Sequence, residues 1–344
     1  MKSFASDNYS GIAPEILQAI IEANTNHAPS YGADSYTENA IVLFKKIFGE
    51  SISVYFVTNG TAANTLGLKA VINSHHSIIC ADTSHLVTQE VGACISAIGC
   101  MVLQIPHQNG KITPSAIEET YNQAIYWGRH NNKPKVVSIA QSTEFGTVYT
   151  LEELAAISRV CKKHTLLFHM DGCRLANAAV ALDATFNELT VDVGVDILSF
   201  GGTKNGLAFG EAIVFLKPLD DEFEYIHKQE LQLLSKMRFL SAQFIPYLEQ
   251  DIWKKNATQA NLMCKQLYQG LKQHKSLRFA YPVETNQLFV YFTDQLIKAT
   301  QDLTPYYIWN KQSNLVRLVT SFDTTAQEVE NFLDRISECV QQGM

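Results

Sequence analysis

The residue of this sequence best suited to covalent chemistry is Lys204, which lies in the glycine-rich segment 199–206 (SFGGTKNG). Apolar runs flank this segment, so the lysine is expected to be largely buried. Burial lowers the pKa of a lysine, and the neutral amine is a nucleophile toward carbonyl carbons. The alternative is a solvent-exposed loop lysine, the usual state of this residue type. The glycines argue against it, because they indicate backbone held close to a ligand.

A carboxylate, Asp171, ends a second apolar run in the segment 168–174 (FHMDGCR). A buried carboxylate needs a cationic partner or hydrogen-bond donors. A protonated pyridine nitrogen is one such partner, and the carboxylate then keeps the ring an electron sink. The alternative is that Asp171 is the N-cap of the helix that follows.

A third segment, 59–64 (NGTAAN), lies between an expected strand and an expected helix. Free N–H groups and the dipole at a helix N-terminus bind phosphate. Gly60 allows close approach of the backbone, and Thr61 offers both its N–H and its hydroxyl. The segment is not a Walker A loop, because no Gly-Lys-Ser/Thr follows at the required spacing. The alternative is a turn in which Thr61 is the N-cap.

Short apolar runs that alternate with helical patterns position these three segments. The expected strands are residues 54–57, 77–80, 101–105, 136–140, 166–170, 197–200 and 212–215. Strands of this length, apolar on both faces, indicate a mainly parallel sheet covered by helices on both sides, which is the α/β class. Ligands of such sheets bind beyond the carboxyl ends of the strands, which is where the three segments lie.

The pattern changes after residue 218. Residues 221–275 are almost entirely helical in character, residues 287–291 and 315–318 are expected strands, and an amphipathic helix is expected over 325–341. We therefore predict two parts: an N-terminal arm and large domain over residues 1–245, and a small C-terminal α+β domain over residues 246–344. No low-complexity linker separates them, so they are expected to pack tightly.

The composition is that of an ordinary globular enzyme. The 344 residues are 46% hydrophobic and 18% charged, and the net charge of −7 argues against a nucleic-acid partner. The seven cysteines are odd in number and none has C-x-x-C spacing, so reduced, buried thiols are expected, with neither disulfides nor a metal site. The N-terminus lacks the apolar core of a signal peptide and no run is long enough to span a bilayer. We expect a cytoplasmic protein that does not bind membranes.

The order of phosphate loop, strand-end aspartate and strand-end lysine is that of the aspartate-aminotransferase-like pyridoxal phosphate enzymes. Within that group, the sequence resembles the low-specificity L-threonine aldolases of the β-eliminating lyase family. The segments that carry the resemblance are spread over almost the whole chain: residues 4–11, 31–34, 59–64, 169–174, 200–206 and 235–240. It implies a large domain of the PLP-dependent transferase type (fold type I).

The resemblance implies roles for the reactive residues of the three segments and for His85. Lys204 would carry pyridoxal 5'-phosphate as a Schiff base, and Asp171 would pair with its pyridine nitrogen. Gly60 and Thr61 would hold the phosphate, with help from Thr203. His85 matches the histidine that lies over the cofactor ring, and histidine is also suited to accept a proton from a substrate hydroxyl at neutral pH. An isolated histidine is otherwise more often structural.

The resemblance also implies the groups that bind the substrate. Arg174 and Arg317 match the arginines that hold the substrate carboxylate, a task for which a planar guanidinium is well suited, and Ser6 adds a hydroxyl. The alternative for Arg317 is a surface arginine on an edge strand. Glu144 occupies the place of a histidine that many relatives carry, so the preference for side chain and β-configuration is expected to differ from theirs.

Relatives are homotetramers with active sites at dimer interfaces, and this chain is expected to assemble in the same way. Arg238 and Lys236 match a basic pair that reaches toward the cofactor phosphate of a neighbouring subunit. The alternative for this pair is ordinary solvated charge on a helix.

The expected activity is a carbon–carbon lyase reaction of amino-acid metabolism. It cleaves L-threonine, L-allo-threonine and related β-hydroxy-α-amino acids to glycine and an aldehyde. One alternative keeps the cofactor and changes the reaction to β-elimination or transamination. Another is a non-catalytic protein that keeps the fold, against which Lys204, Asp171 and Arg317 argue.

Overall fold

The computed structural model describes residues 3–342. Its larger part is built around a seven-stranded sheet. The strand order is β1-β7-β6-β5-β4-β2-β3. Only β7 runs antiparallel to its neighbours β1 and β6, so the prediction of a mainly parallel sheet is confirmed. The strands are β1 (Ser53–Val57), β2 (His76–Ala81), β3 (Met101–Ile105), β4 (Lys133–Ala140), β5 (Leu167–Gly172), β6 (Ile197–Gly201) and β7 (Glu211–Phe215).

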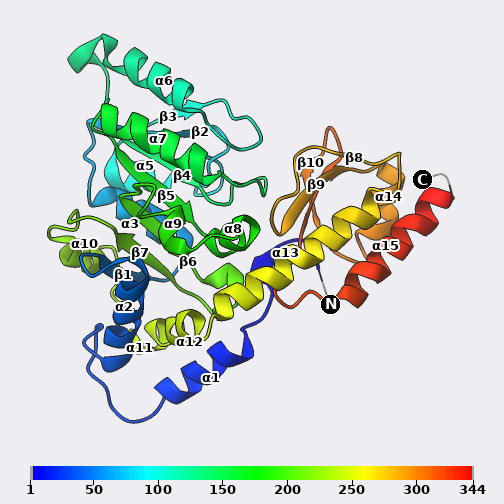
Figure 1. The fold of residues 1–344 in the computed structure, drawn as a ribbon, viewed down its shortest axis with the longest axis horizontal. Helices are drawn as coiled ribbons and strands as arrows, with labels where there is room; N and C mark the ends of the chain where they lie inside the picture. The colour runs from blue at the N-terminus through cyan, green and yellow to red at the C-terminus, as the bar shows by residue number, and fades with distance from the viewer. Residues whose placement is uncertain (1–2, 343–344) are drawn as a thin grey trace.

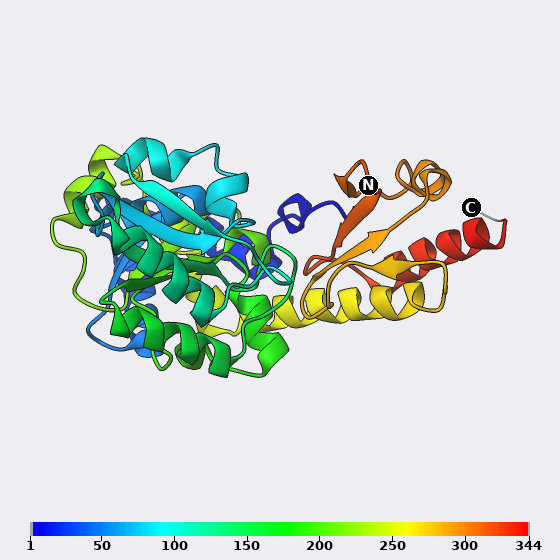
Figure 2. The ribbon, with the colours of Figure 1, turned by 90° about the horizontal axis from the view of Figure 1, so that it is seen from above.

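Helices pack on both faces of this sheet (Figures 1 and 2). The reason is visible in β6, where Leu198 and Phe200 enter the main apolar cluster on one face and Ile197 enters a second cluster, beneath α3, on the other. The helices of this part are α1 (Pro14–Ala23), α2 (Ser35–Phe48), α3 (Gly60–Lys69), α4 (His85–Thr88), α5 (Ala93–Ile98), α6 (Pro114–Tyr126), α7 (Leu151–Lys163), α8 (Leu175–Leu182), α9 (Phe186–Leu189), α10 (Phe223–Gln229), α11 (Arg238–Ser241) and α12 (Phe244–Glu249), with short 3-10 turns η1 (Asp7–Tyr9), η2 (Gly128–His130) and η3 (Thr203–Asn205).

A second, antiparallel sheet with its own apolar cluster forms the C-terminal part. Its order is β10-β11-β9-β8, and α13 runs from the large sheet to this one (Figure 1). The elements are α13 (Ile252–Leu271), β8 (Arg278–Phe279), β9 (Gln287–Tyr291), α14 (Asp294–Thr300), β10 (Tyr307–Asn310), β11 (Leu315–Val319) and α15 (Ala326–Gln341). The predicted α+β character is therefore confirmed. The boundary predicted at residue 246 falls inside α12 and remains a proposal.

The N-terminal arm belongs spatially to the C-terminal sheet. The N–H of Phe4 donates to the carbonyl of Pro305 at 2.9 Å, and the N–H of Val319 donates to the carbonyl of Phe4 at 2.8 Å. The phenyl ring of Phe4 enters the apolar cluster of this part. The arm thereby spans from the small sheet toward the edge of the large one.

The prediction that residues 221–275 are almost entirely helical is wrong between α10 and α11, where Leu231 has a φ of 64° that a right-handed helix cannot contain. The seven cysteines are unpaired, and all but Cys173 are buried, as expected. Within residues 3–342, no helix combines the length and the apolar character that crossing a bilayer requires.

Candidate active site

A cavity of about 260 Å³ opens at the carboxyl ends of β1, β4, β5 and β6. Because β7 runs in the opposite direction, its first residue, Glu211, lies at the same edge. The cavity brings together most of the predicted site residues: Gly60, Thr61, His85, Glu144, Asp171, Arg174, Thr203 and Lys204. Ser6, Arg238 and Arg317 do not line it.

Lys204 lies in η3, directly after β6, and lines the cavity instead of pointing into solvent. Burial acts to lower its pKa, but negative charge at Cys173, Asp7 and Glu211 acts in the opposite direction, and the net pKa is raised above its ordinary value. The expectation of a lowered pKa is therefore wrong for the protein alone. The amine is therefore a cation at neutral pH.

The glycines before Lys204 have a different cause from the one expected. A Cβ atom on Gly201 would lie 2.5 Å from the backbone of Cys173, and one on Gly202 would lie 2.5 Å from a methyl of Leu207. The backbone is thus pressed against the protein's own chain. This packing fixes where the Lys204 turn leaves the sheet.

Asp171 ends β5 and is 8% exposed. Its Oδ1 accepts from the N–H of Cys173 at 3.0 Å, and its Oδ2 accepts from the side-chain amide of Asn64 at 2.9 Å. The N-cap of α8 is Arg174, so the helix-cap alternative for Asp171 is wrong. Burial acts to raise the pKa of Asp171, but Lys204, His85 and the hydrogen bonds outweigh it, and the net pKa is lowered. The carboxylate is ionised at neutral pH.

The N-terminus of α3 presents its first turn to the cavity. The N-cap is Asn59, whose Oδ1 accepts from the N–H of Ala62 at 2.9 Å, so the alternative role of Thr61 as N-cap is wrong. Gly60 and the side chain of Thr61 line the cavity with Thr203 from the opposite loop. A Cβ atom on Gly60 would lie 2.8 Å from Sγ of Cys173, so no larger residue fits here. Hydroxyls and helix N–H groups are the donors that a phosphate needs.

Two carboxyl groups of the cavity hold their protons unusually firmly. Burial is the main cause that raises the pKa of Glu144, in the loop after β4, to about 7, and the charge of Asp171 adds to it. Burial likewise raises the pKa of Glu211 to about 7. Sequence reasoning missed Glu211, because a lone Glu at the start of an apolar strand carries no pattern. Both groups exchange protons near neutral pH, as acid–base catalysis requires.

Arg174 lines the cavity but is already paired. Its Nε donates to Oδ2 of Asp7 at 2.7 Å and its second nitrogen donates to Oδ1 at 2.9 Å, a bidentate ion pair. Asp7 is 1% exposed and also accepts from the amide of Asn286 at 3.0 Å. Its pKa is lowered: burial acts to raise it, but Arg174 outweighs this effect. Asp7 thus occupies one edge of the guanidinium, through Nε and one terminal nitrogen, and the predicted role of Arg174 toward a substrate carboxylate stays a prediction.

Arg317 lies on β11, between β10 and β9, so the edge-strand alternative is wrong. One terminal nitrogen donates to the carbonyl of Ala5 at 3.0 Å, while the buried Nε has no partner in the described part of the chain. The guanidinium lies 5.0 Å from the ring centre of Trp309 and 5.2 Å from that of Tyr307. Burial and the charge of Arg174 lower its pKa to about 10. Arg317 therefore retains a donor for an anion.

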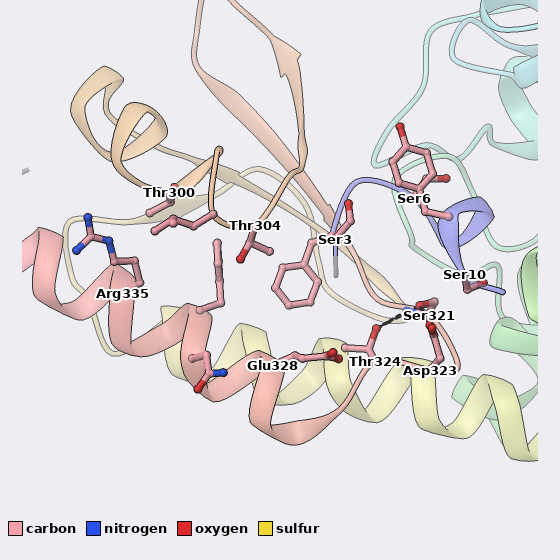
Figure 3. A pocket seen from close by; sticks show the side chains of 15 residues that line it. Ser3, Ser6, Ser10, Thr300, Thr304, Ser321, Asp323, Thr324, Glu328 and Arg335 are labelled. Carbon is pink, nitrogen blue, oxygen red and sulfur yellow. Dashed lines mark hydrogen bonds between the residues drawn. The ribbon is translucent and has the colours of Figure 1, made fainter. Parts of the chain in front are cut away.

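A larger cavity, of about 510 Å³, lies between the N-terminal arm and α15 (Figure 3). Ser6 and Ser10 stand at one end and Arg335 at the other, with hydroxyl side chains between them. Ser6 thus lines this cavity and not the one that Lys204 lines, and its hydroxyl accepts from the N–H of Asn8 at 3.2 Å. The reactive groups gather in the smaller cavity, so size alone does not identify the site here.

Arg238 lies in α11, where it donates to the carbonyl of Asn26 at 3.0 Å. Neither it nor the exposed Lys236 lines the cavity of their own chain. Their predicted role toward a neighbouring subunit stays a prediction.

Comparisons with known proteins agree with this geometry. Residues 3–295 match the profile of the family described as beta-eliminating lyase. The chain is 42% identical over 333 residues to the low specificity L-threonine aldolase of Pseudomonas sp. (strain NCIMB 10558), covering 95% of both chains. It is 40% identical over 332 residues to the enzyme of the same name from Pseudomonas aeruginosa, again covering 95% of both. A solved structure of Leishmania major threonine aldolase superposes with a TM-score of 0.94 at 29% identity, covering 99% of this chain and 100% of that one.

Proposed function

The chain belongs to the β-eliminating lyase family, and from this premise we propose that it is a pyridoxal-phosphate-dependent aldehyde-lyase of the threonine aldolase type. Its substrates are L-threonine, L-allo-threonine and related β-hydroxy-α-amino acids, and its products are glycine and an aldehyde. The observation that carries the proposal is that Lys204, ionised Asp171 and the N-terminus of α3 face one cavity.

The residues of the cavity fit the cofactor. Lys204 would bind its aldehyde carbon, Asp171 its pyridine nitrogen, and Gly60, Thr61 and Thr203 its phosphate. The fit rests on a buried, ionised carboxylate at one end and on hydroxyl and helix N–H donors at the other, in a cup that a Cβ at Gly60 would fill. Pyridoxal phosphate, when bound, supplies an electron sink for bonds broken at Cα.

The chain's own groups bind and orient the substrate. Arg317 offers its unpartnered Nε to the carboxylate, and orientation of the bond to be broken is the main contribution of such a contact. Arg174, which lines the cavity and is held by Asp7, adds positive charge that also acts on Arg317. Glu144 and His85 line the same cavity, and in this proposal His85 accepts the proton of the β-hydroxyl.

The experiment that tests this function is product analysis with purified protein loaded with cofactor. L-Threonine and L-allo-threonine are supplied separately, and glycine, acetaldehyde, keto acid and ammonia are quantified. Equal amounts of glycine and acetaldehyde support the proposal. Keto acid without glycine would mean β-elimination or transamination, and absence of any turnover would mean a non-catalytic member of the fold.

The family likeness also supports a cytoplasmic homotetramer whose sites lie at dimer interfaces. In that assembly Arg238 and Lys236, which are outside the cavity of their own chain, reach a neighbour's phosphate site. Light scattering gives the oligomeric state. Mixing Arg238→Ala subunits with Lys204→Ala subunits tests the shared site, because recovered activity in the mixed oligomer requires groups from both chains.

A further inference from the structure

The ring of His85 is connected to Asp171 through two buried side chains. Nδ1 of His85 lies 2.8 Å from Oε1 of Glu90, and the amide nitrogen of Asn64 donates to that same oxygen at 2.9 Å. The same amide nitrogen donates its second hydrogen to Oδ2 of Asp171 at 2.9 Å. One neutral amide thus joins two carboxylates, one of which holds the histidine.

Glu90 is buried far more deeply than the histidine it holds. The residue is 4% exposed and its side chain 0%, whereas the side chain of His85 is 41% exposed and lines the cavity. The second oxygen of Glu90, Oε2, is buried without a partner in the described chain. A buried carboxylate that is only half satisfied is costly to the fold, so its retention calls for a role beyond packing.

The hydrogen bond determines which nitrogen of His85 is available. A carboxylate only accepts, so a neutral His85 carries its hydrogen on Nδ1 and donates it to Glu90. Nε2 is then the nitrogen with a free lone pair, and it has no hydrogen-bond partner among residues 3–342. A third contact fixes the backbone of the residue, since the N–H of His85 donates to Oε1 of Glu144 at 2.9 Å.

From this chain of contacts we infer that Glu90 is a positioning residue, which fixes the Nδ1–H form of His85 so that Nε2 takes the proton of the substrate β-hydroxyl. The inference rests on the proposed aldol cleavage. In that step the O–H bond breaks and its proton goes to Nε2. The electron pair of that bond forms the carbonyl of the leaving aldehyde, and the Cα–Cβ pair stays with the glycine half, which takes up a proton before release. The carboxylate of Glu90 stabilises the resulting imidazolium.

Two variants separate the charge of Glu90 from its shape. Glu90→Gln keeps an oxygen that can accept from His85 and Asn64 but removes the charge, while Glu90→Ala removes both. A matched control is Asp220→Asn, since the carboxylate of Asp220 accepts from the hydroxyl of Tyr55 at 2.9 Å, outside the cavity. We expect kcat for L-allo-threonine to fall about tenfold in Glu90→Gln and about a hundredfold in Glu90→Ala, with KM within about threefold of the unmodified protein. Asp220→Asn keeps its activity.

A second measurement needs neither substrate nor cofactor. In protein labelled with ¹⁵N at the histidine ring nitrogens, and with His85→Gln used to assign the signal, the neutral ring of His85 should show its hydrogen on Nδ1. This preference should be lost in Glu90→Ala and kept in Asp220→Asn. If Glu90→Ala does not fold, the wild-type spectrum and Glu90→Gln decide the matter.

The outcomes separate this inference from the proposed function. A hydrogen on Nε2 in the unmodified protein would overturn the inference, and so would unchanged kcat in both Glu90 variants of an active enzyme. If the unmodified protein cleaves no β-hydroxy amino acid, the proposed function fails, whereas the spectrum still reports whether Glu90 sets the form of His85.

Discussion

Replacement of Glu144 by glutamine should stabilise the protein without cofactor at alkaline pH and not at acidic pH. The pKa of Glu144 is raised from 4.5 to about 7, with burial as the main cause. Below pH 4.5 the group is protonated in both the folded and the unfolded chain, so it contributes nothing. Between pH 4.5 and 7 the folded chain keeps a proton that the unfolded chain releases, so stability falls as the pH rises. Above pH 7 the full penalty is present.

The size of this effect follows from the same numbers. A pKa difference of about 2.5 corresponds to about 3 kcal/mol. With an unfolding entropy of about 2.1 cal/mol/K per residue, a chain of 344 residues should show a rise in Tm of about 4 °C for the variant. Glutamine is isosteric and can still accept from the N–H of His85, so the comparison isolates the charge.

The assay is thermal unfolding of the unmodified and Glu144→Gln proteins, both without cofactor, at pH 5 and pH 8.5. We expect nearly equal Tm values at pH 5 and a higher Tm for the variant at pH 8.5. Glu188→Gln is the control, and its Tm at pH 8.5 should be lower than that of the unmodified protein. The reason is that hydrogen bonds from Thr185 lower the pKa of Glu188 and so favour its ionised form in the folded chain. A variant that is less stable than the unmodified protein at pH 8.5, or equally shifted at both pH values, would mean that the ionised form of Glu144 does not destabilise the fold.

The remaining predictions concern Arg317 and the ion pair between Asp7 and Arg174. Arg317→Ala should raise KM for amino-acid substrates about tenfold to a hundredfold, because a charged hydrogen bond to the substrate is lost. The visible absorbance of the bound cofactor should stay unchanged. Loss of that absorbance would mean that Arg317 binds the cofactor. Asp7→Asn should lower the free energy of unfolding by about 3 kcal/mol at pH 7, because it leaves Arg174 buried without its counter-ion, and urea unfolding that shows no loss would contradict this. That difference should shrink as the pH falls through the lowered pKa of Asp7.

The large sheet could be predicted from the sequence because its strands are short apolar runs buried on both faces. In β7, for example, every residue from Glu211 to Phe215 is buried, and four of the five are apolar, which leaves few other arrangements. The reactive groups could be predicted as well, since each follows such a run and therefore lies at the same edge of the sheet. The residue at which a helix begins was harder to predict. For α3 the N-cap is Asn59, whereas the sequence had offered Thr61 as the alternative.

What the sequence could not reveal are contacts between residues far apart in the chain. Asp7 and Arg174 form a buried ion pair, yet neither position has a pattern that names the other. The same holds for Lys204, because Cys173, Asp7 and Glu211, which together reverse the expected direction of its pKa shift, come from three other segments of the chain. Glu90 lies near His85 in the chain, but its contact with Asn64 depends on how α3 packs against that segment.

The most direct test of the account is to find which lysine holds the cofactor. The protein loaded with pyridoxal phosphate is reduced with borohydride and digested, and the peptides are identified by mass spectrometry. We expect a phosphopyridoxyl group on the peptide that contains Lys204, and neither label nor turnover in Lys204→Ala. A label on another lysine, or undiminished glycine formation by Lys204→Ala, would contradict it.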